Sequence, residues 1–137
     1  MKKAIFSFAL CLFSCSLCAQ KTFKSSLFDS ENQINLHIDL YEETVNVPGM
    51  DMFGPMNGYM NGNIYGIWMI TSAKVLDERT AVIRLSNDLG SETQEGRLTM
   101  KNDSTYLLEF QNGMAVKKVV NKKLVKIPQK LTFARKK

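Results

Sequence analysis

Apolar and polar residues alternate along much of this chain, and short clusters of turn-forming residues interrupt the alternation. The clearest run starts at residue 34, where the apolar residues Ile34, Leu36, Ile38 and Leu40 are separated by polar ones. A period of two puts the apolar side chains on one face of a β-strand. Turn-forming residues then recur about every 8–12 residues, which is typical of a small barrel or sandwich. We therefore expect strands throughout and no long helix.

The spacing of the turns predicts an all-β fold, a small antiparallel meander barrel or sandwich of about seven to eight strands. Connections are short after residue 64, so strands that follow one another in sequence should pair in space. Asn112-Gly113 predicts a hairpin turn, because both residue types tolerate positive φ angles. Gly66-Ile67-Trp68 resembles the Gly-x-Trp motif of lipocalins. That resemblance implies a barrel that is lipocalin-like in general style, with the tryptophan closing its base.

The first 19 residues have the composition of an export leader. Two lysines precede an apolar run from Ala4 to Leu17, and Ala19 stands at a suitable cleavage site. The run is too short for a transmembrane helix, which needs about 20 residues. We expect a signal peptide over residues 1–19 and an exported protein, either periplasmic or secreted. In the alternative, Leu12-Phe13-Ser14-Cys15 is a lipobox and Cys15 carries a lipid anchor.

Residues 20–33 are polar and mixed, and they predict a loose lead-in to a single β domain over residues 34–137. All three cysteines lie in the leader, so the processed chain would contain no thiol and no disulfide. Its one histidine is His37, and the sequence has no zinc-type His/Cys spacing, phosphate-binding glycine loop or serine-elbow motif. We expect a protein that binds and does not catalyse, and export excludes a nucleic-acid partner.

The segment 48–63 departs from the strand pattern. It contains four methionines, a phenylalanine and a tyrosine among four glycines, and its one charged residue is Asp51. Long loops in compact domains are commonly functional, and methionine-rich surfaces adapt to varied partners. We predict that this loop presents an apolar surface to a protein partner, for example as a protease-inhibitor-like module, or to a small apolar ligand. The expected contact residues are Met52, Phe53, Met56, Tyr59 and Met60. In another interpretation the loop only caps an open end of the barrel.

A shorter stretch suggests a different chemistry. Val45-Asn46-Val47-Pro48-Gly49-Met50-Asp51-Met52 is similar to the Val-Asn-Trp-Pro-x-Met-x-Met segment of the periplasmic copper chaperones of copper/silver efflux systems. Those proteins are small β-barrels that hold the metal with one histidine, two methionines and a tryptophan. The resemblance implies an alternative function, periplasmic Cu(I) binding by Met50, Met52 and His37, although Val47 stands in place of the tryptophan. Thioethers are soft ligands that suit Cu(I).

Charge is distributed unevenly along the chain. Residues 117–137 contain nine basic side chains and no acidic one, whereas residues 20–116 contain seven basic and thirteen acidic ones. The lysines near the carboxyl end alternate with apolar residues, which favours a soluble outer face on the last strands. The same segment could contact an anionic glycan, a lipid such as lipopolysaccharide, or an acidic protein.

Overall fold

The computed structural model describes residues 22–136. The predicted signal peptide over residues 1–19, with Cys15, lies outside the described residues. Strands dominate the described chain, and the helical element among them is a single 3₁₀ turn. The elements are β1 (Lys24–Asp29), β2 (Ile34–Asp39), η1 (Asp51–Phe53), β3 (Gly58–Gly62), β4 (Trp68–Val75), β5 (Thr80–Asn87), β6 (Thr93–Asn102), β7 (Thr105–Gly113), β8 (Lys117–Val120), β9 (Lys123–Lys126) and β10 (Lys130–Arg135).

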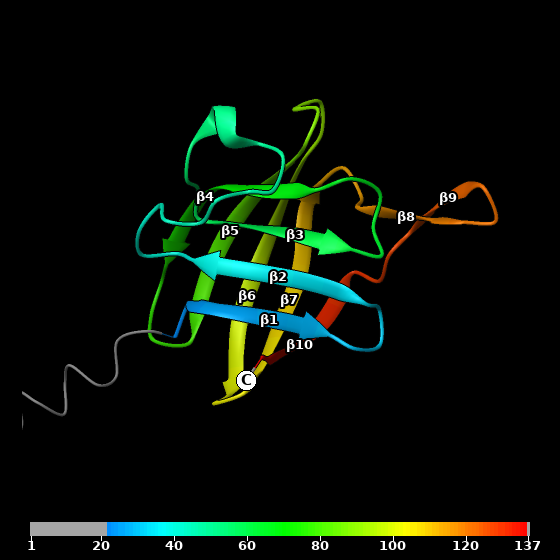
Figure 1. The fold of residues 1–137 in the computed structure, drawn as a ribbon. Coiled ribbons are helices and arrows are strands. Elements are labelled where there is room, and N and C mark those ends of the chain that lie inside the picture. The colour runs from blue at the N-terminus through cyan, green and yellow to red at the C-terminus, as the bar shows by residue number, and fades with distance from the viewer. Residues whose placement is uncertain (1–21, 137) are drawn as a thin grey trace, which may run out of the picture.

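Eight of these strands close into an antiparallel barrel in the order β1-β10-β7-β6-β5-β4-β3-β2 (Figure 1). Strands β1 to β7 pair with their sequence neighbours, as expected for a meander. Strands β8 and β9 form a separate two-stranded sheet that leaves the barrel between β7 and β10. The predicted all-β fold is therefore confirmed, and of the two predicted architectures the chain adopts the barrel.

One apolar cluster fills the inside of the barrel, and every barrel strand contributes to it. The members that are completely shielded from solvent include Leu27, Leu36, Met60, Ile70, Leu85, Leu98, Leu108 and Phe133. Burial of a side chain of this size contributes about 1.5–3 kcal/mol. Barrels of eight strands have an interior just wide enough for side chains to fill it, so the cluster accounts for stability without a disulfide among the described residues.

The up-and-down order gives the barrel two distinct ends. One end holds the connection from Asp39 in β2 to Gly58 in β3, which contains η1. The opposite end holds the connection from Gly113 in β7 to Lys130 in β10, which contains β8 and β9. Figure 1 shows the η1 connection rising above the barrel wall and the β8–β9 hairpin projecting to the right.

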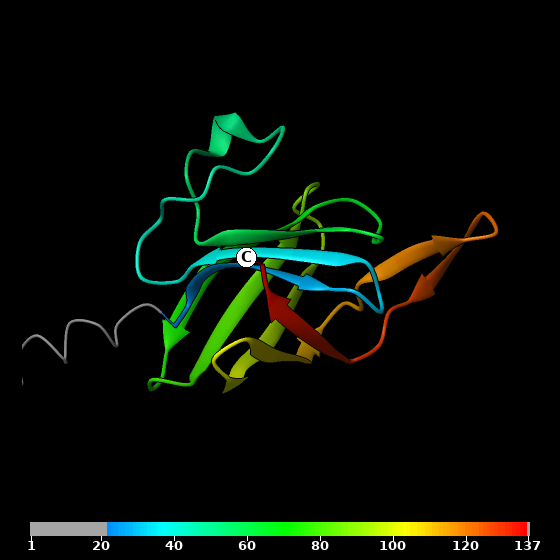
Figure 2. The same cartoon turned by 60° about the horizontal axis from the view of Figure 1, so that its bottom comes forward.

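The barrel closes where the first and last strands meet, and this seam is short. Leu27 of β1 pairs with Arg135 of β10, and Phe28 pairs with Ala134 (Figure 2). Two consecutive hydrogen bonds support the seam. The Arg135 guanidinium donates to the Tyr106 hydroxyl, and that hydroxyl donates to the carbonyl oxygen of Thr22.

Two expectations about boundaries are wrong. Of the predicted loose lead-in over residues 20–33, the described part from residue 22 onward is not loose, because β1 occupies Lys24–Asp29 and forms the barrel wall between β2 and β10. The predicted loop 48–63 is also too long, because Gly58–Gly62 form β3. Its glycines permit close pairing with β2: a Cβ at Gly58 would lie 2.1 Å from the His37 carbonyl oxygen. Glycine, which normally weakens a strand, here marks a close backbone approach.

The expected Asn112-Gly113 hairpin is wrong as well. Strand β7 continues through Gly113, which is paired with Gln94 of β6. A Cβ at Gly113 would lie 2.3 Å from the Thr93 carbonyl oxygen, so glycine is required there for strand contact. The actual two-residue turn is Asn121-Lys122, where both φ angles are positive, at 50° and 66°. It joins β8 to β9.

Candidate functional site

The connection between β2 and β3 carries most of the residues that the sequence predicts to bind. We call residues 48–57 the methionine loop. The loop is closed at its base by a pair of backbone hydrogen bonds, in which the Val45 and Met56 amides donate to each other's carbonyl oxygens at 3.0 and 2.8 Å. Val47 is buried beside this bridge, with 2% of its surface exposed. The loop therefore rises from an ordered stem.

Asp39, at the end of β2, organises the stem. Its carboxylate accepts hydrogen bonds from the backbone amides of Tyr41 and Glu42 and from the Thr44 hydroxyl. Its backbone amide donates to the carbonyl oxygen of Asn57, just before β3. Burial by itself raises the pKa of the Asp39 carboxyl, but the hydrogen bonds from Thr44, Glu42 and Tyr41 and the Lys24 ammonium together lower it. The carboxylate thus stays ionised while it holds the stem.

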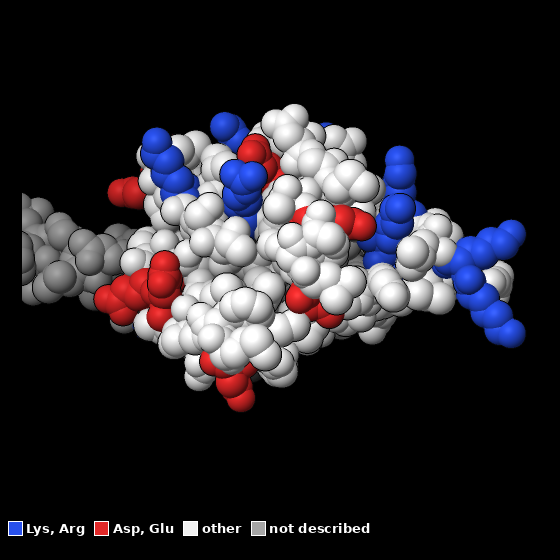
Figure 3. Space-filling view, turned by 90° about the horizontal axis from the view of Figure 1, so that it is seen from above, with Lys and Arg blue, Asp and Glu red and all other residues white. Residues whose placement is uncertain are grey.

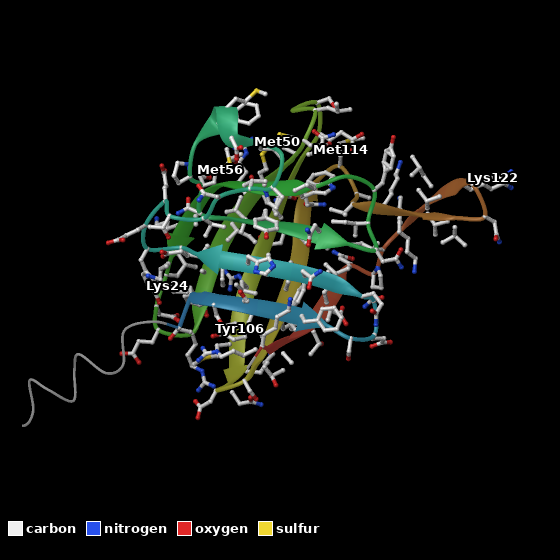
Figure 4. The ribbon with its side chains drawn as sticks, viewed as in Figure 1. Lys24, Met50, Met56, Tyr106, Met114 and Lys122 are labelled. Atoms are coloured by element: carbon white, nitrogen blue, oxygen red, sulfur yellow. The ribbon has the colours of Figure 1, made fainter. Side chains whose placement is uncertain are left out.

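The tip of the methionine loop is apolar and exposed. The η1 turn is held by the Phe53 amide, which donates to the Met50 carbonyl oxygen at 3.1 Å, and by Gly54, which donates to Asp51. Met52 exposes 83% of its surface and Phe53 exposes 53%. Met50 and Met56 are half-buried beneath them in the loop (Figure 4). A short turn on an anchored stem therefore presents two large apolar side chains to solvent.

The five predicted contact residues do not form one surface. Met52 and Phe53 are exposed at the tip, and Met56 lies in the stem bridge. Tyr59 and Met60 belong to β3, where alternation points them to opposite faces. Met60 is fully buried in the core, so its prediction as a contact residue is wrong. Tyr59 is half-buried on the outer face of the barrel.

Tyr59 belongs to a second feature, a shallow groove of 330 Å³ around His37 that is lined by both polar and apolar side chains. The His37 and Tyr59 rings are 4.8 Å apart, and the Ser26 hydroxyl is 2.9 Å from His37 Nδ1. Burial, with a smaller contribution from the Lys136 ammonium, lowers the pKa of His37, which favours the neutral imidazole. Sequence reasoning missed Ser26, because the Ser26–His37 pairing follows from the β1–β2 register and has no local signal.

The copper-chaperone resemblance implies Met50, Met52 and His37 as ligands, and of these three His37 alone lines the groove. Val45 and Asn46 from the stem line the His37 groove, but none of the described methionines does. Met52 instead extends from the loop tip, and Met50 lies at the start of η1. The described residues also contain no group of three or more histidine, cysteine or acidic side chains that could hold a metal ion.

A third feature lies at the opposite end of the barrel. Trp68 is 3% exposed and begins β4, so it belongs to the core at the end from which the β8–β9 hairpin projects. It lines a small pocket of 130 Å³ together with Tyr65, Asp88 and Leu124. The lipocalin-like Gly-x-Trp segment thus contributes a core tryptophan to the fourth strand and not to the first.

Comparisons with family models, curated proteins and solved structures gave no match for this chain. Within residues 22–136, helices long and apolar enough to cross a membrane are absent.

Proposed function

We propose that this protein is an exported, non-enzymatic binding protein that engages a protein partner through the tip of the methionine loop. The observation that carries the proposal is the exposure of Met52 and Phe53 on a stem fixed by Asp39, Val47 and the bridge to Met56. A loop that merely capped the barrel would turn these side chains inward. An inhibitor-like segment that enters a groove of its target is one form that such a contact can take.

The free energy gained by burying the two tip side chains is small compared with the cost of association. Complete burial of a fully exposed apolar side chain yields about 1.5–3 kcal/mol, so Met52 and Phe53, which are 83% and 53% exposed, together supply about 2–4 kcal/mol. Association costs at least about 4 kcal/mol in lost freedom of motion. These two residues would therefore be the energetic centre of a larger interface, in which the surrounding contacts exclude water.

A macromolecular partner is favoured over a small ligand held inside the barrel. Fully buried side chains from the barrel strands already pack against one another in its interior. The exposed apolar surface lies instead on a projecting loop, where a flexible thioether can adapt to the shape of a partner. An ordered stem supports this role, because preorganisation reduces the entropy lost on binding.

Site-specific photo-crosslinking in the cell of origin tests the proposal. A photoreactive amino acid at exposed Asp51 samples the tip and leaves Met52 and Phe53 intact, and one at Ser91 samples the opposite end of the barrel. We expect a discrete adduct from residue 51 that disappears in the Met52→Ser/Phe53→Ser variant.

The matched control is Leu89→Ser, because Leu89 exposes the same 83% of its surface as Met52. The adduct should survive this substitution. An adduct that persists without Met52 and Phe53, or equal labelling from residues 51 and 91, contradicts the proposal. Substitutions are preferable to deletion of the segment, because residues 58–62 are a barrel strand.

A further inference from the structure

The β8–β9 hairpin, residues 117–126, stands away from the barrel, and we call it the lysine hairpin. Within the described chain, β8 pairs with β9 alone. The base of the hairpin is fixed, because the Tyr65 amide donates to the Lys117 carbonyl oxygen at 2.7 Å and the Ile127 amide donates to Val116. Val116 and Ile127 are buried. Figures 1 and 2 show the remainder projecting beyond the barrel end.

Both faces of the lysine hairpin mix positive charge with apolar surface. Its ten residues include five lysines and no acidic residue. The register places Lys117, Val119, Leu124 and Lys126 on one face, and Lys118, Val120, Lys123 and Val125 on the other. The four apolar side chains are 40–53% exposed. In Figure 3 the outermost blue side chains of the projection stand apart from the red ones, whereas Asp88 and Glu92 line a pocket with Lys117 at its base.

The turn places a further charge at the outermost point. Asn121 and Lys122 both have positive φ, as in a type I′ turn, where glycine normally takes the second position. Lysine in this conformation is strained. Because Lys122 lies in this turn, its side chain is at the far tip of the projection, as Figure 4 shows.

Three kinds of partner for the lysine hairpin differ in which of its faces and edges they cover. A second copy that paired hairpin to hairpin would set five lysines against five, which is repulsive. An acidic peptide strand added at an edge would use the backbone groups of β8 or β9 and leave both faces uncovered. An anionic lipid surface contacts both faces and the tip together, because lysines reach the phosphates while the apolar side chains enter the interface.

We propose that the lysine hairpin docks the protein on membranes that contain anionic lipids. Its apolar side chains enter the headgroup region and its lysines bind phosphate groups. The rest of the chain supports a single orientation, because residues 20–116 and 127–137 together have eleven basic and thirteen acidic side chains and are nearly neutral. An anionic surface therefore attracts the hairpin end more strongly than the body. This inference does not depend on the methionine loop.

Vesicle co-sedimentation of the processed protein tests the proposal. The probes are vesicles of phosphatidylcholine alone and vesicles in which one-third of the lipid is phosphatidylglycerol. We expect binding to the anionic vesicles only, weakening as salt is raised. Each lysine near such a surface changes affinity by roughly fivefold. Lys122→Glu/Lys123→Glu should therefore lower affinity by at least roughly 25-fold.

The matched control is Lys74→Glu/Lys101→Glu, which makes the same change of charge at exposed positions on the barrel body. It should alter affinity far less than the hairpin variant. Val119→Thr/Leu124→Thr, which keeps strand-forming side chains, should also weaken binding. Circular dichroism and thermal unfolding confirm that each variant is folded.

Three results would overturn the proposal. The first is equal binding to neutral and anionic vesicles, which removes the role of charge. The second is an equal loss of affinity in the hairpin and body variants, which shows a general charge effect. The third is tighter binding to polyglutamate than to anionic vesicles, which identifies an acidic polypeptide as the occupant.

Discussion

The methionine loop and the lysine hairpin leave opposite ends of one barrel, and they are attached to it in different ways. The loop connects two adjacent barrel strands, and its stem is tied by Asp39, the Val45–Met56 bridge and buried Val47. The hairpin is a separate sheet, held by the contacts at its base. The loop has one charge, at Asp51, whereas the hairpin has five lysines.

Because of this difference, we expect substitutions in the two elements to have different effects on the stability of the barrel. Damage to the loop stem should spread into the barrel, because the same residues hold β2 against β3. Damage to the outer part of the hairpin should stay local, because those residues contact few groups in the barrel. Long insertions at a surface are tolerated when the elements around them remain packed.

The largest effect should come from Gly58→Ala, at the point where the loop enters β3. The added Cβ would lie 2.1 Å from the His37 carbonyl oxygen and 3.0 Å from the Ile70 side chain, so two strands must separate. We expect a loss of about 3 kcal/mol in the free energy of unfolding by urea. In the control Gly49→Ala, where a Cβ meets no atom within 4 Å, the loss should be much smaller. Equal losses would show that β2–β3 pairing is not tight.

Asp39→Asn should have the next largest effect. The amide has the shape of the carboxylate but lacks its charge, so the hydrogen bonds from Thr44, Glu42 and Tyr41 weaken. Hydrogen bonds to charged groups contribute about 1.5–3 kcal/mol, and we expect a loss of about 2 kcal/mol in urea unfolding at neutral pH. An unchanged midpoint would mean that the stem does not depend on this carboxylate.

The pH dependence of stability provides a milder test of the same group. The folded-state pKa of Asp39 is below its ordinary value of 3.8. The contribution of the Asp39 carboxylate to the free energy of unfolding is therefore complete above pH 3.8. It disappears as the pH falls through the lowered folded-state pKa. The difference in unfolding free energy between the wild type and Asp39→Asn should therefore be constant from pH 7 to pH 5 and decrease towards pH 3. A difference that grew on acidification would contradict this assignment.

The smallest effect should be a gain in local stability at the hairpin tip. Lys122→Gly relieves the strain of a positive φ, worth about 1 kcal/mol. Hydrogen exchange at the Val120 and Lys123 amides should slow, while the urea midpoint of the barrel stays unchanged. Binding to anionic vesicles should weaken by roughly fivefold, because one lysine is lost. A shift of the barrel midpoint would show that hairpin and barrel unfold together.

Much of the barrel could be predicted from alternation alone. The run that starts at Ile34 matches β2, and the same alternation is present in the sequences of β5 and β7, because each strand has one buried and one solvated face. Strand β3 could not be predicted in this way, since Gly58 and Gly62 resemble loop residues in sequence. The function of these glycines depends on a neighbouring strand, and that information is absent from the local pattern.

The candidate site was predictable only in part. Met52 and Phe53 stand out by composition, and the structure exposes both. Asp39 and Ser26 could not be singled out, because their partners are fixed by the turn after β2 and by the β1–β2 register. The lysine hairpin was visible as a basic segment, but its separation from β7 was not, because Asn112-Gly113 imitated a hairpin turn.

The short seam between β1 and β10 has a consequence for how the molecule matures. Leu27 is made about a hundred residues before its partner Arg135, so the ring stays an open sheet while the strands between them are synthesised. An open sheet offers unpaired backbone groups at β1 and β7 to other nascent chains. A stop codon placed just before β10 would preserve β1 to β9 and still leave a product prone to aggregate.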